Sequence, residues 1–127
     1  MQTRIGENGN CWEAVIASLL EIPIYRVPDF PRDDESEFVE SVQRWLSGMT
    51  DDLFYCRVSV DNPDAIAAFV TGDVWHVIEG TSPRGGPHAC VGLNGKIVHD
   101  PHPNASPSGL VKVDCFGFLV SRAKGGM

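Results

Sequence analysis

The sequence predicts a small α+β fold in which helices come first and an antiparallel sheet follows. Three observations support this: a capped apolar helix near the N-terminus, alternating apolar segments in the second half, and an Asn94-Gly95 pair typical of a hairpin turn. With 127 residues, of which 43% are hydrophobic, the chain is expected to form one domain over 1–127 with its own core.

Two helices are predicted in the N-terminal half. Asn10 is a good N-cap residue, and Glu13 three positions later completes a capping-box pattern, so the first helix is expected over 11–20. Prolines interrupt the segment that follows. A second helix is predicted over 33–47, because acidic residues crowd its start and apolar residues recur at helical spacing.

Most of the second half is predicted to form strands. Apolar alternation and turn signals place them at 53–60, 73–79, 88–93 and 96–99, followed by a last pair, 110–113 and 116–120, around Asp114-Cys115. A short helix over 65–70 is expected between the first two strands, because Asn62-Pro63 is a helix-start pattern.

Composition and charge argue against several classes of partner. The net charge of −7 and the pI near 4.9 disfavour nucleic acid and anionic membrane, since both require a basic face. No N-terminal segment resembles a signal peptide and no apolar run approaches a membrane span, so a cytoplasmic location is expected. The four cysteines are then expected to be reduced, and their spacing matches neither a disulfide framework nor a zinc ribbon.

Cys11 is the first residue of the first predicted helix. The unpaired N–H groups and the positive end of the helix dipole favour a thiolate at this position, which makes Cys11 a candidate nucleophile. The alternative is a structural role, because free cysteines are usually small core residues.

A base and an acid for this thiol are predicted at one end of the hairpin. Regular pairing about the Asn-Gly turn sets Val91 near Val98, so His88 at the start of one strand neighbours Asp100 at the end of the next. A hydrogen bond between the two would fix the imidazole tautomer and stabilise the imidazolium. Together with Cys11, these residues form the set used for nucleophilic acyl transfer.

With these residues in this order, the chain resembles the papain-like cysteine peptidase superfamily. The matching segments are Gly9-Asn10-Cys11-Trp12, His88-Ala89-Cys90-Val91-Gly92 and Val98-His99-Asp100-Pro101. The chain looks most similar to the compact bacterial domains that process double-glycine leader peptides in bacteriocin exporters, and to small phage-encoded and bacterial papain-like proteins. The resemblance implies a papain-like fold, with a central nucleophile helix packed on a C-terminal antiparallel sheet. It also implies a cysteine peptidase or amidase that needs no cofactor and acts on a peptide or amide-containing substrate.

The resemblance further implies a glutamine upstream of the cysteine that helps to form the oxyanion hole, and Gln2 is the candidate. Asn8 and Asn10 are alternative donors. Trp12 is a candidate for contact with the substrate. Arg84, in the glycine- and proline-rich loop before the third strand, is a candidate for binding a substrate carboxylate, its alternative being an exposed loop residue.

Two other functions stay open at the level of the sequence. The same fold without catalysis would be a binding module, for instance a phage protein that engages a host factor in the host cytoplasm. A zinc-binding domain is the second alternative, because His88 and Cys90 share one strand face and His99 and His102 follow nearby. The sequence does not distinguish a peptidase from an isopeptidase, deamidase or acyltransferase, and it leaves the oligomeric state open.

Overall fold

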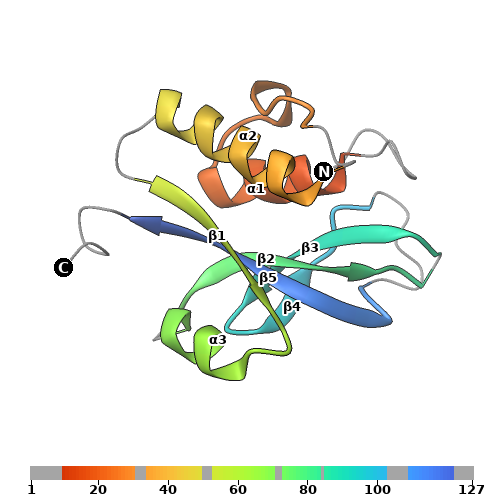
Figure 1. Cartoon of the computed structure of the whole chain (residues 1–127). Coiled ribbons are helices and arrows are strands. Elements are labelled where there is room, and N and C mark those ends of the chain that lie inside the picture. The colour runs from red at the N-terminus through yellow and green to blue at the C-terminus, as the bar shows by residue number, and fades with distance from the viewer. Residues whose placement is uncertain are drawn as a thin grey trace.

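Three α-helices and five antiparallel strands make up the part of the chain that the structure, a computed structural model, describes (Figure 1). This part comprises residues 10–30, 34–49, 53–70, 73–83, 85–102 and 109–121. The elements are α1 (Cys11–Leu20), a 3₁₀ turn (Ile24–Arg26), α2 (Glu35–Met49), β1 (Leu53–Ser59), α3 (Pro63–Phe69), β2 (Trp75–Thr81), β3 (Pro87–Leu93), β4 (Lys96–His99) and β5 (Lys112–Ser121). Within the described ranges, no helix is both long enough and apolar enough to cross a membrane.

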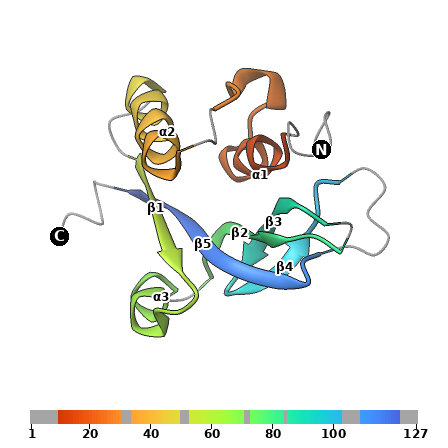
Figure 2. The same ribbon diagram turned by 45° about the vertical axis from the view of Figure 1, so that its right-hand side comes forward.

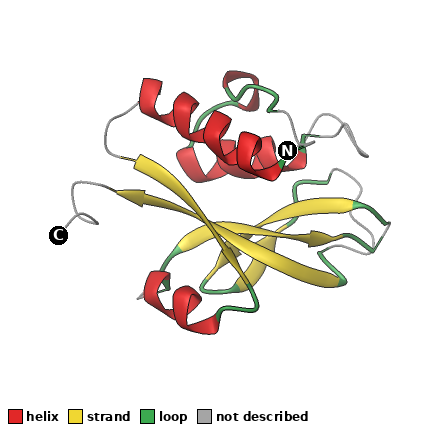
Figure 3. Ribbon diagram, in the orientation of Figure 1, coloured by secondary structure: helices red, strands yellow, loops and turns green. Residues whose placement is uncertain are grey.

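The five strands form one sheet in the order β1-β5-β2-β3-β4, with every neighbouring pair antiparallel. Helices α1 and α2 lie together on one side of the sheet, and α3 lies on the other side (Figures 1 and 2). Figure 3 shows how the helical elements flank the twisted sheet. The predicted α+β class, with an antiparallel sheet, is therefore confirmed.

Two short strands around Asp114-Cys115 were predicted at the end of the chain, and the structure has a single strand, β5, in their place. It is one strand of ten residues that pairs with β1 along one edge and with β2 along the other. Hydrogen-bonded partners on both edges favour a continuous strand over the weak turn signal at this dipeptide. A bulge between Glu79 and Gly80 adjusts β2 to β5, and a side chain at Gly80 would collide with the Lys112 carbonyl oxygen.

The first helix has the predicted bounds, but the predicted capping box is wrong. The Asn10 side chain makes no cap hydrogen bond, and the Glu13 carboxylate accepts instead from the Phe30 N–H at 3.4 Å. Glu13 is only 2% exposed, and its carboxylate binds the backbone of the segment after α1 and does not cap the helix. The cap of α3 does form, because the Asn62 side chain accepts from the Ala65 N–H at 3.2 Å.

The core between the sheet and the first two helices is built around Trp12. Its ring makes edge-on contacts with Phe30, Phe38 and Tyr55 at centroid distances of 5.0 to 5.7 Å. Its Nε1–H donates to the Tyr55 hydroxyl at 3.2 Å, so the ring is fixed in orientation as well as in place. Because Trp12 follows Cys11 on the chain, this packing holds the start of α1 firmly against the sheet.

Candidate active site

Cys11 begins α1 and is buried, with 8% of its surface exposed. Its apolar cluster includes Ala89 and Val91 of β3, and α1 packs on this strand more than on any other. Ala89 directly follows His88. The candidate nucleophile therefore lies at a helix start, against the strand that carries the candidate base.

The structure contains the predicted contact between His88 and Asp100. Nε2 of His88 lies 2.7 Å from Oδ1 of Asp100, and the two side chains are 5% and 6% exposed. A carboxylate only accepts hydrogen bonds when it is ionised, so this contact assigns the ring proton of the neutral imidazole to Nε2. Nδ1 is then the nitrogen with a free lone pair, and this is the atom that can act as a base.

A β-bulge that was not predicted brings Asp100 to the side of the strand pair that carries His88. Regular pairing from the turn would have placed the carboxylate on the opposite side. The register instead shifts by one residue, so that Val91 pairs with His99. Continuing this register by one residue sets Asp100 beside Cys90, whose side chain shares one side of β3 with His88.

Asp100 also accepts two backbone hydrogen bonds, from His102 N–H and from Gly109 N–H, both at 2.8 Å. Burial acts to raise the pKa of this carboxyl group, but the hydrogen bonds from Gly109, His102 and His88 outweigh it, and the pKa lies below its ordinary value. The carboxylate is thus ionised throughout the neutral range. These backbone donors leave no mark in the sequence, which is why the additional role of Asp100 in holding the chain at 102 and 109 was missed.

Cys90 is the third member of a compact group with His88 and Asp100, which we name the His88 cluster. One donor atom from each of the three residues lies within 4.8 Å of the others, and Cys90 is fully buried. Cys11 is not part of this group. A catalytic thiol is not expected in it, because thiol and carboxylate face different nitrogens of the imidazole in a Cys–His–Asp triad.

The histidines that flank Asp100 have different environments. His99 is exposed on β4, whereas His102 is buried with its ring centroid 6.2 Å from that of His88. Only His102 therefore belongs to the surroundings of the site.

The loop before His88 is closed by hydrogen bonds of Ser82. Its N–H donates to the Gly86 carbonyl at 3.1 Å, and its hydroxyl donates to the Gly85 carbonyl at 3.0 Å. Gly85 has a φ angle of 91° and Gly86 one of 81°, and such positive values favour glycine. This closed loop fixes where β3 begins. Arg84 of the same loop lies outside the described residues.

Gln2 and Trp12 are the remaining candidates for the site. Gln2, like the alternative donor Asn8, lies outside the described residues, so the structure does not place the predicted oxyanion glutamine. Trp12 is 0% exposed and its ring is enclosed by other aromatic side chains. It has no surface on which a substrate can lie, and we assign it to the core instead of to substrate binding.

A second group of a carboxylate and a thiol lies on the side of the sheet that faces α2, and we name it the Arg57 cluster. Arg57 donates to both carboxylate oxygens of Glu79, at 2.8 and 2.6 Å, and the Cys115 thiol donates to the same carboxylate at 3.4 Å. The Arg57 guanidinium also lies 4.9 Å from the centre of the Phe38 ring. The cluster joins β1, β2 and β5, whose pairing the sequence did not predict, and so it was missed.

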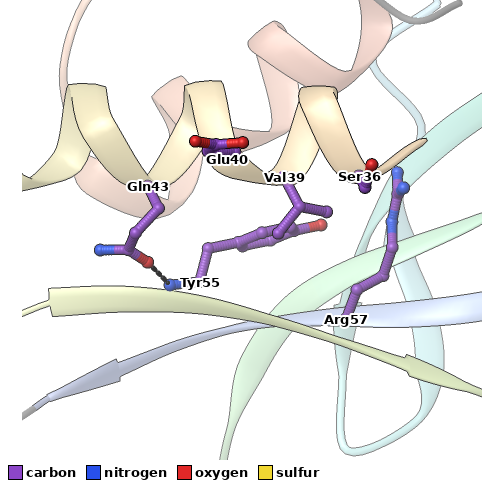
Figure 4. Close-up of a pocket in the computed structure, with 6 residues that line it drawn as sticks. All are labelled: Ser36, Val39, Glu40, Gln43, Tyr55 and Arg57. Atoms are coloured by element: carbon purple, nitrogen blue, oxygen red, sulfur yellow. Dashed lines mark hydrogen bonds between the residues drawn. The ribbon is translucent and has the colours of Figure 1, made fainter. Parts of the chain in front are cut away.

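A pocket between α2 and β1 adjoins the Arg57 cluster (Figure 4). Its lining residues are Ser36, Val39, Glu40, Gln43, Tyr55 and Arg57. The Gln43 side chain closes one part of it by accepting from the Tyr55 N–H at 2.9 Å. Burial raises the pKa of the Tyr55 hydroxyl, which therefore stays neutral. The lining includes none of the predicted catalytic residues.

Comparisons of the chain with protein-family models, with curated proteins and with solved structures gave no match. The chemistry of the site must therefore be inferred from its own residues.

Proposed function

We propose that the chain is a papain-like cysteine hydrolase, a peptidase or amidase, in which Cys11, His88 and Asp100 act by acyl transfer. The observation that carries the proposal is the buried 2.7 Å contact of His88 Nε2 with Asp100, which leaves Nδ1 as the basic nitrogen. The placement of Cys11 at the start of a helix that packs on β3 supports it, because a helix start favours the thiolate.

The proposed reaction proceeds in two steps. Nδ1 of His88 takes the thiol proton of Cys11, and the sulfur attacks the carbonyl carbon of the amide. The Cys11 N–H, with Gln2 as the proposed second donor, binds the oxyanion. The imidazolium then gives its proton to the leaving amine as the C–N bond breaks, and a thioester remains. Water, deprotonated by Nδ1, attacks the thioester, which yields the carboxylic acid and the free thiol.

Asp100 has a positioning and electrostatic role in this scheme. It holds the imidazole through Nε2 and stabilises the imidazolium that forms in each step, without itself taking up the proton. Its lowered pKa suits that role, because the carboxylate is charged wherever the thiol chemistry operates.

The proposal sets one geometric requirement. Ala89 and Val91 belong to the cluster that contains α1, so His88, alternating with them, must reach Cys11 around the beginning of β3. A crystal structure with a peptide aldehyde bound to Cys11 is expected to place Nδ1 of His88 within hydrogen-bond reach of the reacting atoms. A ring that stays turned away from Cys11 in that complex would contradict the mechanism.

The first test compares the reactivity of the four cysteines. With iodoacetamide near neutral pH and mass spectrometry of the products, Cys11 is expected to react faster than Cys56, Cys90 and Cys115. His88→Ala is expected to slow the alkylation of Cys11 by about tenfold or more, because the base is lost. His99→Ala is the matched control and should leave the rate unchanged. Equal labelling of all four thiols, or labelling only after denaturation, would rule out the enzyme.

The second test measures hydrolysis directly. Purified protein is incubated with a mixture of peptides and simple amides, and new carboxyl termini are detected by mass spectrometry. Cys11→Ala should abolish every cleavage while the circular dichroism spectrum is unchanged. A reactive Cys11 without any hydrolysis would favour an acyltransferase, and an unreactive Cys11 would favour the binding module.

A further inference from the structure

We infer that the His88 cluster is a binding site for one zinc ion, held by Cys90 Sγ, His88 Nε2 and the Asp100 carboxylate. We also infer that zinc bound there removes His88 from its role as a base. The second part depends on the proposed function, whereas the first part is independent of it.

The positions of the three donor atoms fit a metal ion closely. One ligand atom from each of the three residues lies within 4.8 Å of the others, Nε2 is the ring nitrogen that faces Asp100, and all three side chains are less than a tenth exposed. Zinc bonds of 2.0 to 2.3 Å in a tetrahedron place the donor atoms about 3.3–3.7 Å apart. Small side-chain rotations are thus enough to close the site around an ion, with no change in the strands.

The type of the donor atoms selects the metal. A thiolate, an imidazole and a carboxylate are the three protein ligands that zinc uses, and thiolate binds zinc in preference to magnesium or calcium. Three protein ligands leave a fourth tetrahedral position for a water molecule. The cluster therefore matches an ion of the zinc class and not a hard cation.

The Asp100 carboxylate is already oriented by groups that are not ligands. The Gly109 N–H holds Oδ2 and the His102 N–H holds Oδ1, each at 2.8 Å. Hydrogen bonds of this kind fix a ligating carboxylate and are part of a functional metal site. The cost of ordering this ligand is therefore met before the ion arrives.

Binding has a defined effect on protons. The ion takes the position of the proton between Nε2 of His88 and Asp100, and the ring proton moves to Nδ1. The Cys90 thiol loses its proton to solvent as the Zn–S bond forms. Because Nδ1 then carries a proton and has no lone pair, it can no longer deprotonate Cys11.

The Arg57 cluster supplies a matched control within the same chain. It has a thiol beside a carboxylate, with Cys115 Sγ at 3.4 Å from Glu79, but its third residue is an arginine. A guanidinium has only donors and cannot bind a metal. A variant of Cys115 therefore removes a similar thiol from a place that is not expected to bind zinc.

The test of the metal site uses zinc alone. Protein freed of metal with a chelator is titrated with Zn²⁺ by calorimetry, and the washed complex is analysed for metal. One zinc per chain is expected. Cys90→Ser and His88→Ala should each weaken binding by about a hundredfold or more, while Cys115→Ser should not change it. No stoichiometric binding, or equal binding by Cys90→Ser, would overturn the site.

A second measurement covers the case in which Cys90→Ser does not fold. Co²⁺ bound to the unmodified protein is expected to show the intense charge-transfer absorption of a thiolate ligand. A cobalt complex without this absorption would overturn the assignment of Cys90.

The effect on Cys11 is tested by repeating the iodoacetamide experiment with zinc. Zinc should slow the alkylation of Cys11 by about tenfold or more in the unmodified protein but not in Cys90→Ser. Equal rates with and without bound zinc would overturn the loss of the base. If Cys11 is unreactive from the start while zinc binds with the expected stoichiometry, the proposed function fails and the metal site stands.

Discussion

Each side of the sheet carries a carboxylate beside a thiol, and the two groups differ most in the nitrogen-bearing side chain that holds the carboxylate. In the Arg57 cluster, the carboxylate of Glu79 is held by a guanidinium at 2.6 and 2.8 Å. In the His88 cluster, the carboxylate of Asp100 is held by an imidazole at 2.7 Å. A guanidinium stays charged and can only donate, whereas an imidazole gains and loses a proton near neutral pH and can bind a metal. The choice of arginine or histidine therefore decides which cluster can act as a base or bind a metal ion.

The largest expected effect comes from Asp100→Ala. This change removes the acceptor for three hydrogen bonds, from His88, His102 and Gly109, and leaves these buried or half-buried donors without it. We expect the free energy of unfolding to fall by about 3 kcal/mol, measured by urea denaturation. Asp114→Ala is the control, because that carboxylate is half exposed and its ion pair, at 3.6 Å, is with an exposed lysine. Equal losses in both variants would show that Asp100 has no special structural role.

Glu79→Gln is expected to have the next largest effect. The amide keeps the shape of the side chain but leaves the charge of Arg57, itself 17% exposed, without its counter-ion. We expect a loss of about 2 kcal/mol in urea denaturation, discounted because the pair is not fully enclosed. Zinc binding and Cys11 alkylation should not change.

Glu40→Gln is the matched control for that charge change, because its pair with Arg44 is more than 70% exposed on both sides. It should change the stability by less than about 0.5 kcal/mol. A change in zinc affinity in Glu79→Gln would mean that the two clusters are coupled, against the view that each acts alone.

The elements that the sequence predicted well are those decided by their own residues. α1 and β4 have the predicted bounds, because an apolar helix after Asn10 and a strand after Asn94-Gly95 depend on local signals. β5 was predicted wrongly, since its length depends on the strands that pair with both of its edges. Pairing partners that are distant on the chain are not encoded in a local pattern.

The candidate site was likewise only partly predictable from local sequence patterns. The neighbourhood of His88 and Asp100 followed from counting residues about the turn, but the bulge that places both on one side of the strand pair did not. The bulge also sets Cys90 beside them, so the compact cluster became visible only in three dimensions. Trp12 was misjudged because its burial depends on Phe30, Phe38 and Tyr55, which come from separate parts of the chain.

His76 is a second buried histidine, and its surroundings differ from those of His88. His76 of β2 is 0% exposed, packs against Phe116 and Phe118, and accepts from the Gly95 N–H through Nε2 at 3.0 Å. Within the described part of the chain, its ring nitrogens contact the Val77 carbonyl and the Gly95 N–H and no carboxylate, so its role is to hold the hairpin turn. His76→Leu leaves the Gly95 N–H without its acceptor, and we expect a loss of about 1.5 kcal/mol in urea denaturation.

The same variant separates the structural from the chemical histidine. His76→Leu should leave zinc binding and Cys11 alkylation unchanged, whereas His88→Ala should reduce both. A loss of zinc binding in His76→Leu, with the fold intact by circular dichroism, would show that the β3–β4 turn at Gly95 affects the His88 cluster at the other end of the hairpin.

The smallest expected effect is a dependence of stability on pH that comes from His76. Burial lowers its pKa below the ordinary value of 6.5, and the hydrogen bond to the Val77 carbonyl only partly opposes this. As the pH falls below 6.5, the unfolded chain takes up a proton at this residue before the folded chain does, so the free energy of unfolding decreases until the lowered pKa is reached. The slope is at most about 1.4 kcal/mol per pH unit.

Urea denaturation at several pH values from about 7.5 down to about 4.5 measures this slope, with the window set by the ordinary pKa values of histidine and aspartate. His76→Gln keeps an acceptor for the Gly95 N–H but does not titrate, so it should flatten the curve between pH 6.5 and the lowered pKa. An unchanged slope in His76→Gln would show that the acid sensitivity does not come from His76.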